Sequence, residues 1–203
     1  MNLIDMHCDT LWKMIQQNEY DLMENPWSVS IPAMKEAGTL AQFFACFTCL
    51  EEQNMDYEKC YEQALAMIEL LKNNCKKYSE EICMAGNYED ILKNEQNGQI
   101  SAVLTIEEGG IINGKAQRLE ELWEKGVRLM TPMWNYTNCL GHPNSREPEL
   151  MAKGLTKFGK EIINRAGELG MIIDVSHASD QSFRDILECT DGPVVASHSN
   201  CRV

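Results

Sequence analysis

The chain has 203 residues, which suits one domain at about 150 residues per domain. Its composition, 44% hydrophobic and 24% charged, is that of an ordinary globular protein, and no apolar stretch approaches the ~20 residues that a membrane helix needs. The net charge of -13 repels phosphate backbones and anionic lipid surfaces. We therefore expect a single domain over residues 1–203, with neither nucleic acid nor a membrane as its partner.

The cysteine content favours a reducing compartment. Nine scattered cysteines are an odd number, and the opening segment MNLIDMHCDT lacks the basic and then apolar regions of a secretion signal. Cys46 and Cys49 form a CxxC inside the apolar run LAQFFACFTCL, and no second CxxC completes a structural zinc site. We interpret them as buried thiols of a cytoplasmic protein, with a redox or zinc role as the alternative.

Short apolar runs alternate with helix-like segments along the whole chain. The runs predict six buried strands: Asn2–Met6, Leu40–Phe47, Ile100–Ile106, Val127–Met133, Met171–Val175 and Pro193–Ala196. Apolar spacing and capping residues predict the helices: Tyr57–Cys75, a helix that starts at Asn87, Arg118–Lys125, Thr156–Leu169 and Ser179–Cys189. This pattern is typical of a parallel sheet covered by helices, either open and doubly wound or closed into a barrel.

Three of the four histidines stand where an apolar run ends. They are His7 in NLIDMHCDT, His177 in GMIIDVSHAS and His198 in PVVASHSN. The carboxyl ends of parallel strands form the active-site face of such folds, and neutral imidazole is the commonest metal ligand. Asp9 lies two residues after His7, so both side chains leave the same face of an extended segment. Each histidine alone fits a hydrogen-bonded strand end, but the three together predict a metal site.

A pair of carboxylates follows the third predicted strand, SAVLTIEEGG. Glu107 and Glu108 stand there before Gly109 and Gly110, which let the backbone turn sharply. A carboxylate at this level can bridge two cations about 3.5–4 Å apart. Without the histidines, the same residues would be interpreted as a solvated loop entry.

Four motifs in this order resemble the membrane dipeptidase (renal dipeptidase) family of zinc peptidases. They are IDMHCDT, the Glu108-Gly109-Gly110 turn, DVSH and ASHSN, and the segments GVRLMTPMWN and GLTKFGKEIINRAGELGMIIDVSH extend the resemblance over the whole chain. The resemblance implies a (β/α)8 TIM-barrel type α/β fold, with about six of the eight strand–helix units in this chain. It also implies a bacterial-type, soluble hydrolase that cleaves dipeptides and tolerates D-residues at the C-terminal side.

The same resemblance implies two zinc ions per chain. His7 and Asp9 would hold one ion, His177 and His198 the other, and Glu108 would bridge them. A metal-bridging hydroxide would then attack the peptide bond, because bound zinc lowers the pKa of water toward about 7.

The resemblance places the substrate pocket near the fourth strand end. Trp134 and Asn135 in MWNYTN and His142 in GHPNS are the candidates to line it, and a solvent-exposed loop histidine is the alternative interpretation of His142. Trp134 stands where some members carry a histidine that contacts the tetrahedral intermediate. The family's carboxylate-binding arginine and proton-shuttling aspartate lie beyond Val203, and Arg202 does not match that arginine. We therefore expect a C-terminally truncated chain and assign no catalytic acid.

Two other interpretations remain open. The truncated chain could be a catalytically inactive, metal-binding remnant or an interaction module. It could also be another metal hydrolase of the amidohydrolase or phosphoesterase type, although those open with HxH where this chain has HxD. The first prediction is a zinc dipeptidase with dipeptides as substrates, and a homodimer is an assembly that the sequence leaves open.

Overall fold

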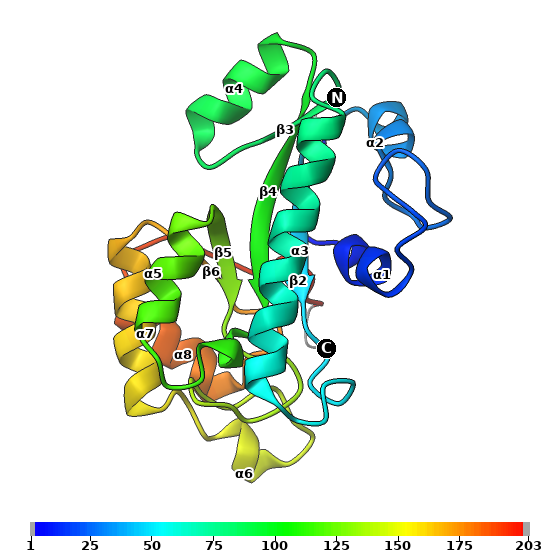
Figure 1. Ribbon diagram of the computed structural model, residues 1–203. Coiled ribbons are helices and arrows are strands. Elements are labelled where there is room, and N and C mark those ends of the chain that lie inside the picture. The colour runs from blue at the N-terminus through cyan, green and yellow to red at the C-terminus, as the bar shows by residue number, and fades with distance from the viewer. Residues whose placement is uncertain (1–2, 201–203) are drawn as a thin grey trace. The chain divides into compact units, whose positions relative to one another are not determined.

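The computed structural model describes residues 3–200, whose contacts divide into two compact units (Figure 1). The first unit covers residues up to 47 and 62–105, and the second covers 48–61 and the chain from 106 onward. The prediction of one domain over 1–203 stays a prediction. None of the described helices is both long enough and apolar enough to cross a membrane.

The first unit is built on parallel strands. They are β1 (Leu3–Asp5), β2 (Thr39–Phe47), β3 (Ile82–Met84) and β4 (Ile100–Glu107), whose last two residues belong to the second unit. β1 pairs with β2 and β3 pairs with β4, both in parallel. Every residue of β4 is buried, as expected for a parallel strand covered on both faces.

Side chains cap the start of two helices in the first unit. The helices of this unit are α1 (Thr10–Gln16), α2 (Ile31–Ala37), α3 (Tyr57–Lys77), whose first turn lies in the second unit, and α4 (Tyr88–Gln96). The Ser30 side chain accepts a hydrogen bond from the Ala33 amide at the start of α2, and Asn87 accepts one from Asp90 at the start of α4. The buried face of α3 carries the apolar residues whose spacing predicts it: Cys60, Ala64, Met67, Ile68 and Leu71.

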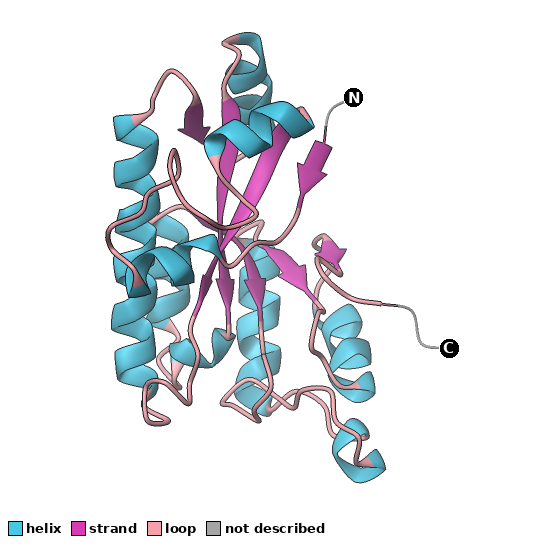
Figure 2. Cartoon of the chain, turned by 90° about the vertical axis from the view of Figure 1, so that its right-hand side faces the viewer, coloured by secondary structure: helices cyan, strands magenta, loops and turns pink. Residues whose placement is uncertain are grey.

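The second unit repeats the strand–helix pattern (Figure 2). Its strands are β5 (Val127–Thr131), β6 (Ile172–Asp174) and β7 (Val194–Val195), paired in parallel in that order. Its helices are the 3-10 helix Gly109–Ile112, α5 (Gln117–Glu124), α6 (Pro148–Met151), α7 (Lys157–Glu168) and α8 (Asp180–Cys189). Thr156 and Ser179 cap α7 and α8 through their side chains, as the sequence predicts.

The register of β6 and β7 sets up the candidate site. Asp174 lies opposite Val195, so each residue of β6 faces a residue 21 positions later. Carried past the strand ends, the same offset brings Ser176 to Ser197 and His177 to His198.

All six predicted strands are present in the described residues, with ends that shift by two residues at most; the predicted start at Asn2 lies outside the described residues. β5 stops at Thr131 instead of Met133 because Pro132 has no amide hydrogen to donate to a ladder. The sequence did not predict β3, α1, α2 or α6. Of these, β3 has three residues and α6 has four, too few for a periodic pattern to emerge.

Candidate metal centre

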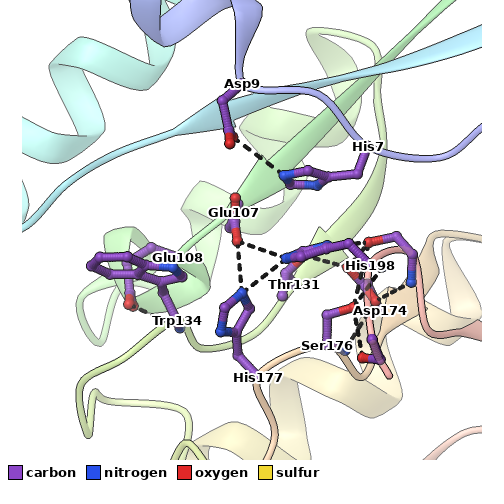
Figure 3. A network of polar contacts seen from close by, with 12 residues as sticks. His7, Asp9, Glu107, Glu108, Thr131, Trp134, Asp174, Ser176, His177 and His198 are labelled. Atoms are coloured by element: carbon purple, nitrogen blue, oxygen red, sulfur yellow. Dashed lines mark hydrogen bonds and ion pairs between the residues drawn. The ribbon is translucent and has the colours of Figure 1, made fainter. Parts of the chain in front are cut away.

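Three potential metal ligands of the second unit converge at the ends of their strands (Figure 3). Glu107 Oε1 lies 3.1 Å from His177 Nε2 and 3.3 Å from His198 Nε2. The two Nε2 atoms lie 2.9 Å from each other. The Glu107 side chain is only 4% exposed, against 24% for His177 and 29% for His198, so the carboxylate forms the floor of the cluster.

The donor atoms fit a zinc ion in kind and in spacing. Two imidazole nitrogens and a carboxylate oxygen are a common zinc ligand set. Bonds of about 2.0–2.2 Å to a tetrahedral ion hold ligand atoms roughly 3.3 Å apart, which is close to the separations among Glu107, His177 and His198.

Asp174 organises the histidine-bearing segments after β6 and β7. Its Oδ1 accepts hydrogen bonds from the backbone amides of Ser176 and Ser197, both at 3.0 Å. Its Oδ2 accepts from Thr131 Oγ1 at 2.8 Å and from Ser197 Oγ at 2.6 Å. Burial by itself raises the pKa of Asp174, but the donors of Ser197 and Ser176 outweigh it and hold the pKa below its ordinary value. Asp174 is therefore an ionised acceptor at neutral pH.

This network assigns the tautomer of His198. The single hydroxyl hydrogen of Ser197 is donated to Asp174, so Ser197 Oγ accepts at the 2.7 Å contact with His198 Nδ1. His198 Nδ1 therefore carries the proton, and the lone pair of its Nε2 points toward Glu107 and His177. A metal-binding histidine uses the same arrangement, with one nitrogen fixed by a hydrogen bond and the other free to bind the ion.

Glu108 lies in different surroundings from Glu107. Its Oε1 accepts hydrogen bonds from the Gly110 amide at 2.9 Å and from Asn138 Nδ2 at 2.5 Å, and its Oε2 accepts from the Trp134 amide at 3.2 Å. The residue is fully buried. Burial raises the pKa of Glu108, and the neighbouring charge of Glu107 adds to the rise, while the three donors oppose it.

The carboxylate that contacts both histidines is that of Glu107, whereas Glu108, the bridging ligand that the resemblance implies, accepts hydrogen bonds from Gly110, Trp134 and Asn138. β4 ends at Glu107, whose side chain points toward His177 and His198. The backbone of Glu108 then turns into the left-handed region at φ 79°, which sends its side chain back over the following turn. The sequence does not reveal this turn, because nothing in the pattern Glu-Glu-Gly-Gly shows which of the two glutamates ends the strand and which one turns.

His7 and Asp9 lie together in the first unit. His7 Nε2 is 3.2 Å from Asp9 Oδ1, and the His7 amide donates to Asp5 Oδ1 at 3.2 Å. Asp9 also stands at the N-terminus of α1, where its backbone leaves the extended conformation. The two side chains are those of the HxD motif, and their role in metal binding stays a prediction.

The residues expected to line a substrate pocket have different surroundings. The Trp134 ring is half-buried and meets His177 edge-on, with centroids 6.3 Å apart. Asn135 is exposed. His142 Nδ1 lies 2.9 Å from the Gly154 carbonyl, and the His142 carbonyl accepts from Ser182 Oγ at the start of α8. Through these bonds His142 connects its own loop to Gly154 and to the start of α8.

A cavity of about 680 Å³ opens beside the two histidines. Its lining includes His177, His198, Asn144, Asp180 and Phe183. Sequence reasoning missed Asp174, Ser197 and Asn138 as organising residues. For the first two a signal exists, because DVSH and ASHS both place polar residues between an apolar run and its histidine.

Comparisons with known proteins bear on the family and on the fold. The family model of the membrane dipeptidases, peptidase family M19, matches residues 1–203. An uncharacterized protein encoded in the PQQ-III 3' region of Acinetobacter calcoaceticus is 28% identical over 183 residues, which are 82% of this chain and 58% of that protein.

Solved structures share the fold. Dipeptidase AC, a metallo peptidase, superimposes with a TM-score of 0.87 at 22% identity over 98% of this chain and 63% of its own. A metallo peptidase from Rhodobacter sphaeroides, liganded with a phosphinate mimic of the dipeptide L-Ala-D-Ala, superimposes with a TM-score of 0.86 at 20% identity. The match covers 98% of this chain and 65% of that protein. The probable dipeptidase PvdM from Pseudomonas aeruginosa superimposes with a TM-score of 0.84 at 20% identity. The match covers 97% of this chain and 52% of that protein.

The chain spans less than two thirds of the length of each of these proteins. The likeness shows the expected fold class, a (β/α)-barrel type α/β fold of which this chain holds a part. Because the family model covers every residue, the chain belongs to the membrane dipeptidase family, peptidase family M19.

Proposed function

We propose that this chain carries the metal-binding residues of a zinc-dependent dipeptidase. One observation carries the proposal: the lone pair of His198 Nε2, fixed by the Asp174–Ser197 hydrogen bonds, faces His177 Nε2 and the Glu107 carboxylate. The 2.9 Å approach of the two Nε2 atoms then requires either a proton on His177 Nε2 or a cation among the three atoms. A divalent ion bound by His177, His198 and Glu107 would take the place of that proton.

The proposed ligand set follows the motifs along the chain. One zinc ion would be held by His7 with Asp9 and the other by His177 with His198, and we assign to Glu107 the ligand role that the resemblance implies for Glu108. Support comes from the family match over the whole chain and from the contacts of Glu107 with both histidines. When bound, zinc supplies a water of lowered pKa as the nucleophile and polarises the scissile carbonyl.

The chain's own residues would orient the reactants. Ser197 holds the Nδ1 proton of His198, which keeps Nε2 directed inward. The Trp134 ring beside His177 would form an apolar wall that limits the access of water. A dipeptide is the proposed substrate, because a related metallo peptidase of the same fold is liganded with a phosphinate mimic of L-Ala-D-Ala. The net charge of -13 favours the ammonium group of an unblocked N-terminus.

The cytoplasm is the proposed location. The eight cysteines within residues 3–200 are free thiols, as is usual in a reducing compartment. Burial raises the pKa of Cys46 in the CxxC far above its ordinary value, which keeps this thiol protonated and unreactive.

The test measures zinc content and peptide specificity together. We expect about two zinc ions per chain after zinc loading and removal of loosely bound metal. Glu107→Gln should lose bound zinc, whereas Glu149→Gln, at an exposed glutamate of α6, should not. Protein that contains this chain should cleave L-Ala-D-Ala in a zinc-dependent reaction and leave N-acetylated dipeptides and tripeptides intact. Zinc binding that is absent, or equally strong in Glu107→Gln, would contradict the proposal.

A further inference from the structure

Glu108 is a fully buried carboxylate that the proposed metal chemistry does not use. Its two oxygens receive three hydrogen bonds, from the Gly110 amide, from Asn138 Nδ2 and from the Trp134 amide. Two of these donors belong to the segment 132–141, which follows β5. Through these two donors, Glu108 attaches the segment to the end of β4.

The segment 132–141 is organised around Asn138. Asn138 Nδ2 also donates to the Pro132 carbonyl at 2.9 Å, and Asn138 Oδ1 accepts from the amides of Leu140 at 2.8 Å and Gly141 at 3.2 Å. The Asn138 amide donates to the Gly141 carbonyl at 3.1 Å. One side chain therefore closes the loop on itself, and Glu108 holds that side chain in place.

The two glycines after Glu108 let the loop come close. A Cβ at Gly109 would lie 2.9 Å from Leu140 Cδ1. A Cβ at Gly110 would lie 2.8 Å from Asn138 Cβ and 2.6 Å from Tyr57 Cε1, and it would collide with the Glu108 carboxylate. Any side chain at either position would push the loop away from the carboxylate that it binds.

The loop presents Trp134 to the histidines. The Glu108 carboxylate fixes the Trp134 backbone amide, while the Trp134 ring meets His177 edge-on, with centroids 6.3 Å apart (Figure 3). The Trp134 ring also meets that of Tyr136, with centroids 6.0 Å apart. Aromatic rings at such distances and tilts pack favourably. The backbone of the residue that carries this ring is therefore held by Glu108.

We propose that Glu108 is a positioning residue: through Asn138 and the Trp134 amide it holds Trp134 as an apolar wall beside His177, where a side chain of the dipeptide packs. That a dipeptide side chain packs against Trp134 rests on the proposed function. The attachment of the loop to Glu108 rests on the hydrogen bonds alone. It separates the adjacent glutamates into two roles, Glu107 at the metal and Glu108 at the loop.

The test compares three variants in the zinc-loaded chain. Glu108→Ala removes all three acceptor contacts. Glu108→Gln keeps an acceptor at one oxygen but presents an amide group to a donor at the other, and it serves if the alanine variant does not fold. Glu107→Gln is the matched control, an isosteric change one residue earlier. Hydrogen exchange of the amides in 133–141 reports the loop, and competition with a chelator reports zinc affinity.

We expect Glu108→Ala to speed exchange of the loop amides by about tenfold or more, with Glu108→Gln intermediate. Zinc affinity in both should stay within about threefold of the parent chain, because no metal ligand is lost. Glu107→Gln should show the reverse, weaker zinc binding with an unchanged loop. For the active enzyme, the Glu108 variants should raise KM for a dipeptide more than they lower kcat, since the wall contacts substrate and not the reacting atoms.

Two results would overturn the inference. One is zinc loss in the Glu108 variants equal to that in Glu107→Gln, which would make Glu108 a ligand. The other is loop exchange that stays at the parent rate in Glu108→Ala. If instead the parent chain binds no zinc while Glu108→Ala still releases the loop, the proposed function fails and the attachment by Glu108 is supported.

Discussion

His177 and His198 face each other with their Nε2 atoms 2.9 Å apart because the register of β6 and β7 continues beyond the strands. The 21-residue offset between Asp174 and Val195 is also the offset between the two histidines. The turns that follow two parallel strands thus bring two imidazoles together. The His177 backbone lies at φ 66°, a left-handed conformation that a turn at this point requires.

Ser197 should control zinc affinity through the tautomer of His198. Ser197→Ala removes the acceptor of the His198 Nδ1 proton, and loss of such an outer contact typically lowers metal affinity about 10–100-fold. Ser197→Thr keeps the hydroxyl and should restore most of the affinity. Ser79→Ala, at an exposed serine, is the control. The measurement is competition with a chelator, and equal affinities for the alanine and threonine variants would contradict the tautomer assignment.

Asp185 should stabilise the second unit in a pH-dependent way. Burial raises the pKa of its carboxyl, but hydrogen bonds from Gln181, the Leu155 amide and Lys160 outweigh this and hold the pKa below its ordinary value. A depressed pKa means that the stabilisation is complete above the unfolded pKa of about 3.9 and is lost as the pH falls through the folded value.

We therefore expect Asp185→Asn to lower the free energy of unfolding by about 1–3 kcal/mol at neutral pH. The difference from the parent chain should shrink as the pH falls below about 4, where the parent carboxylate becomes protonated. Asp191→Asn, at an exposed position, provides the control. Urea unfolding at several pH values measures the effect, and a difference that stays constant with pH would exclude the charged form as its source.

Gly159 should tolerate no side chain. It lies in the first turn of α7, and a Cβ there would collide with the carbonyl group of Leu140, near the end of the segment 132–141. Gly159→Ala should destabilise the chain by about 1–3 kcal/mol or more, because the helix must move away from the loop. Gly98→Asn, where nothing lies within 4 Å and φ is 73°, should cost far less. Thermal unfolding of the two variants distinguishes these outcomes, and equal losses would argue against tight packing at Leu140.

Much of the fold could be predicted because local signals coincide. β4 is apolar throughout and buried throughout, and Thr156 and Ser179 cap their helices as the sequence predicts. β3 could not be predicted, because three residues between charged and turn-forming neighbours carry no period. α1 was not predicted either, and Asp9 at its start makes no side-chain capping bond.

The candidate site was predictable in kind but not in detail. The position of His177 and His198 after apolar runs was enough to group them, because the parallel pairing and the register of β6 and β7 bring the two side chains together. The choice between Glu107 and Glu108 depends on a single backbone turn, at φ 79°, that no residue pattern encodes. Asn138 and Asp174 act through contacts across the fold, to Glu108 and Ser197, which sequence spacing does not show.

X-ray absorption at the zinc edge of the zinc-loaded chain tests the central claim most directly. Histidine and carboxylate ligands give Zn–N and Zn–O distances of about 2.0–2.2 Å, whereas thiolates of the CxxC would give about 2.3 Å. The account predicts only nitrogen and oxygen neighbours with imidazole scattering, and a smaller imidazole contribution in His177→Ala. Sulfur neighbours, or an unchanged spectrum in His177→Ala, would contradict it.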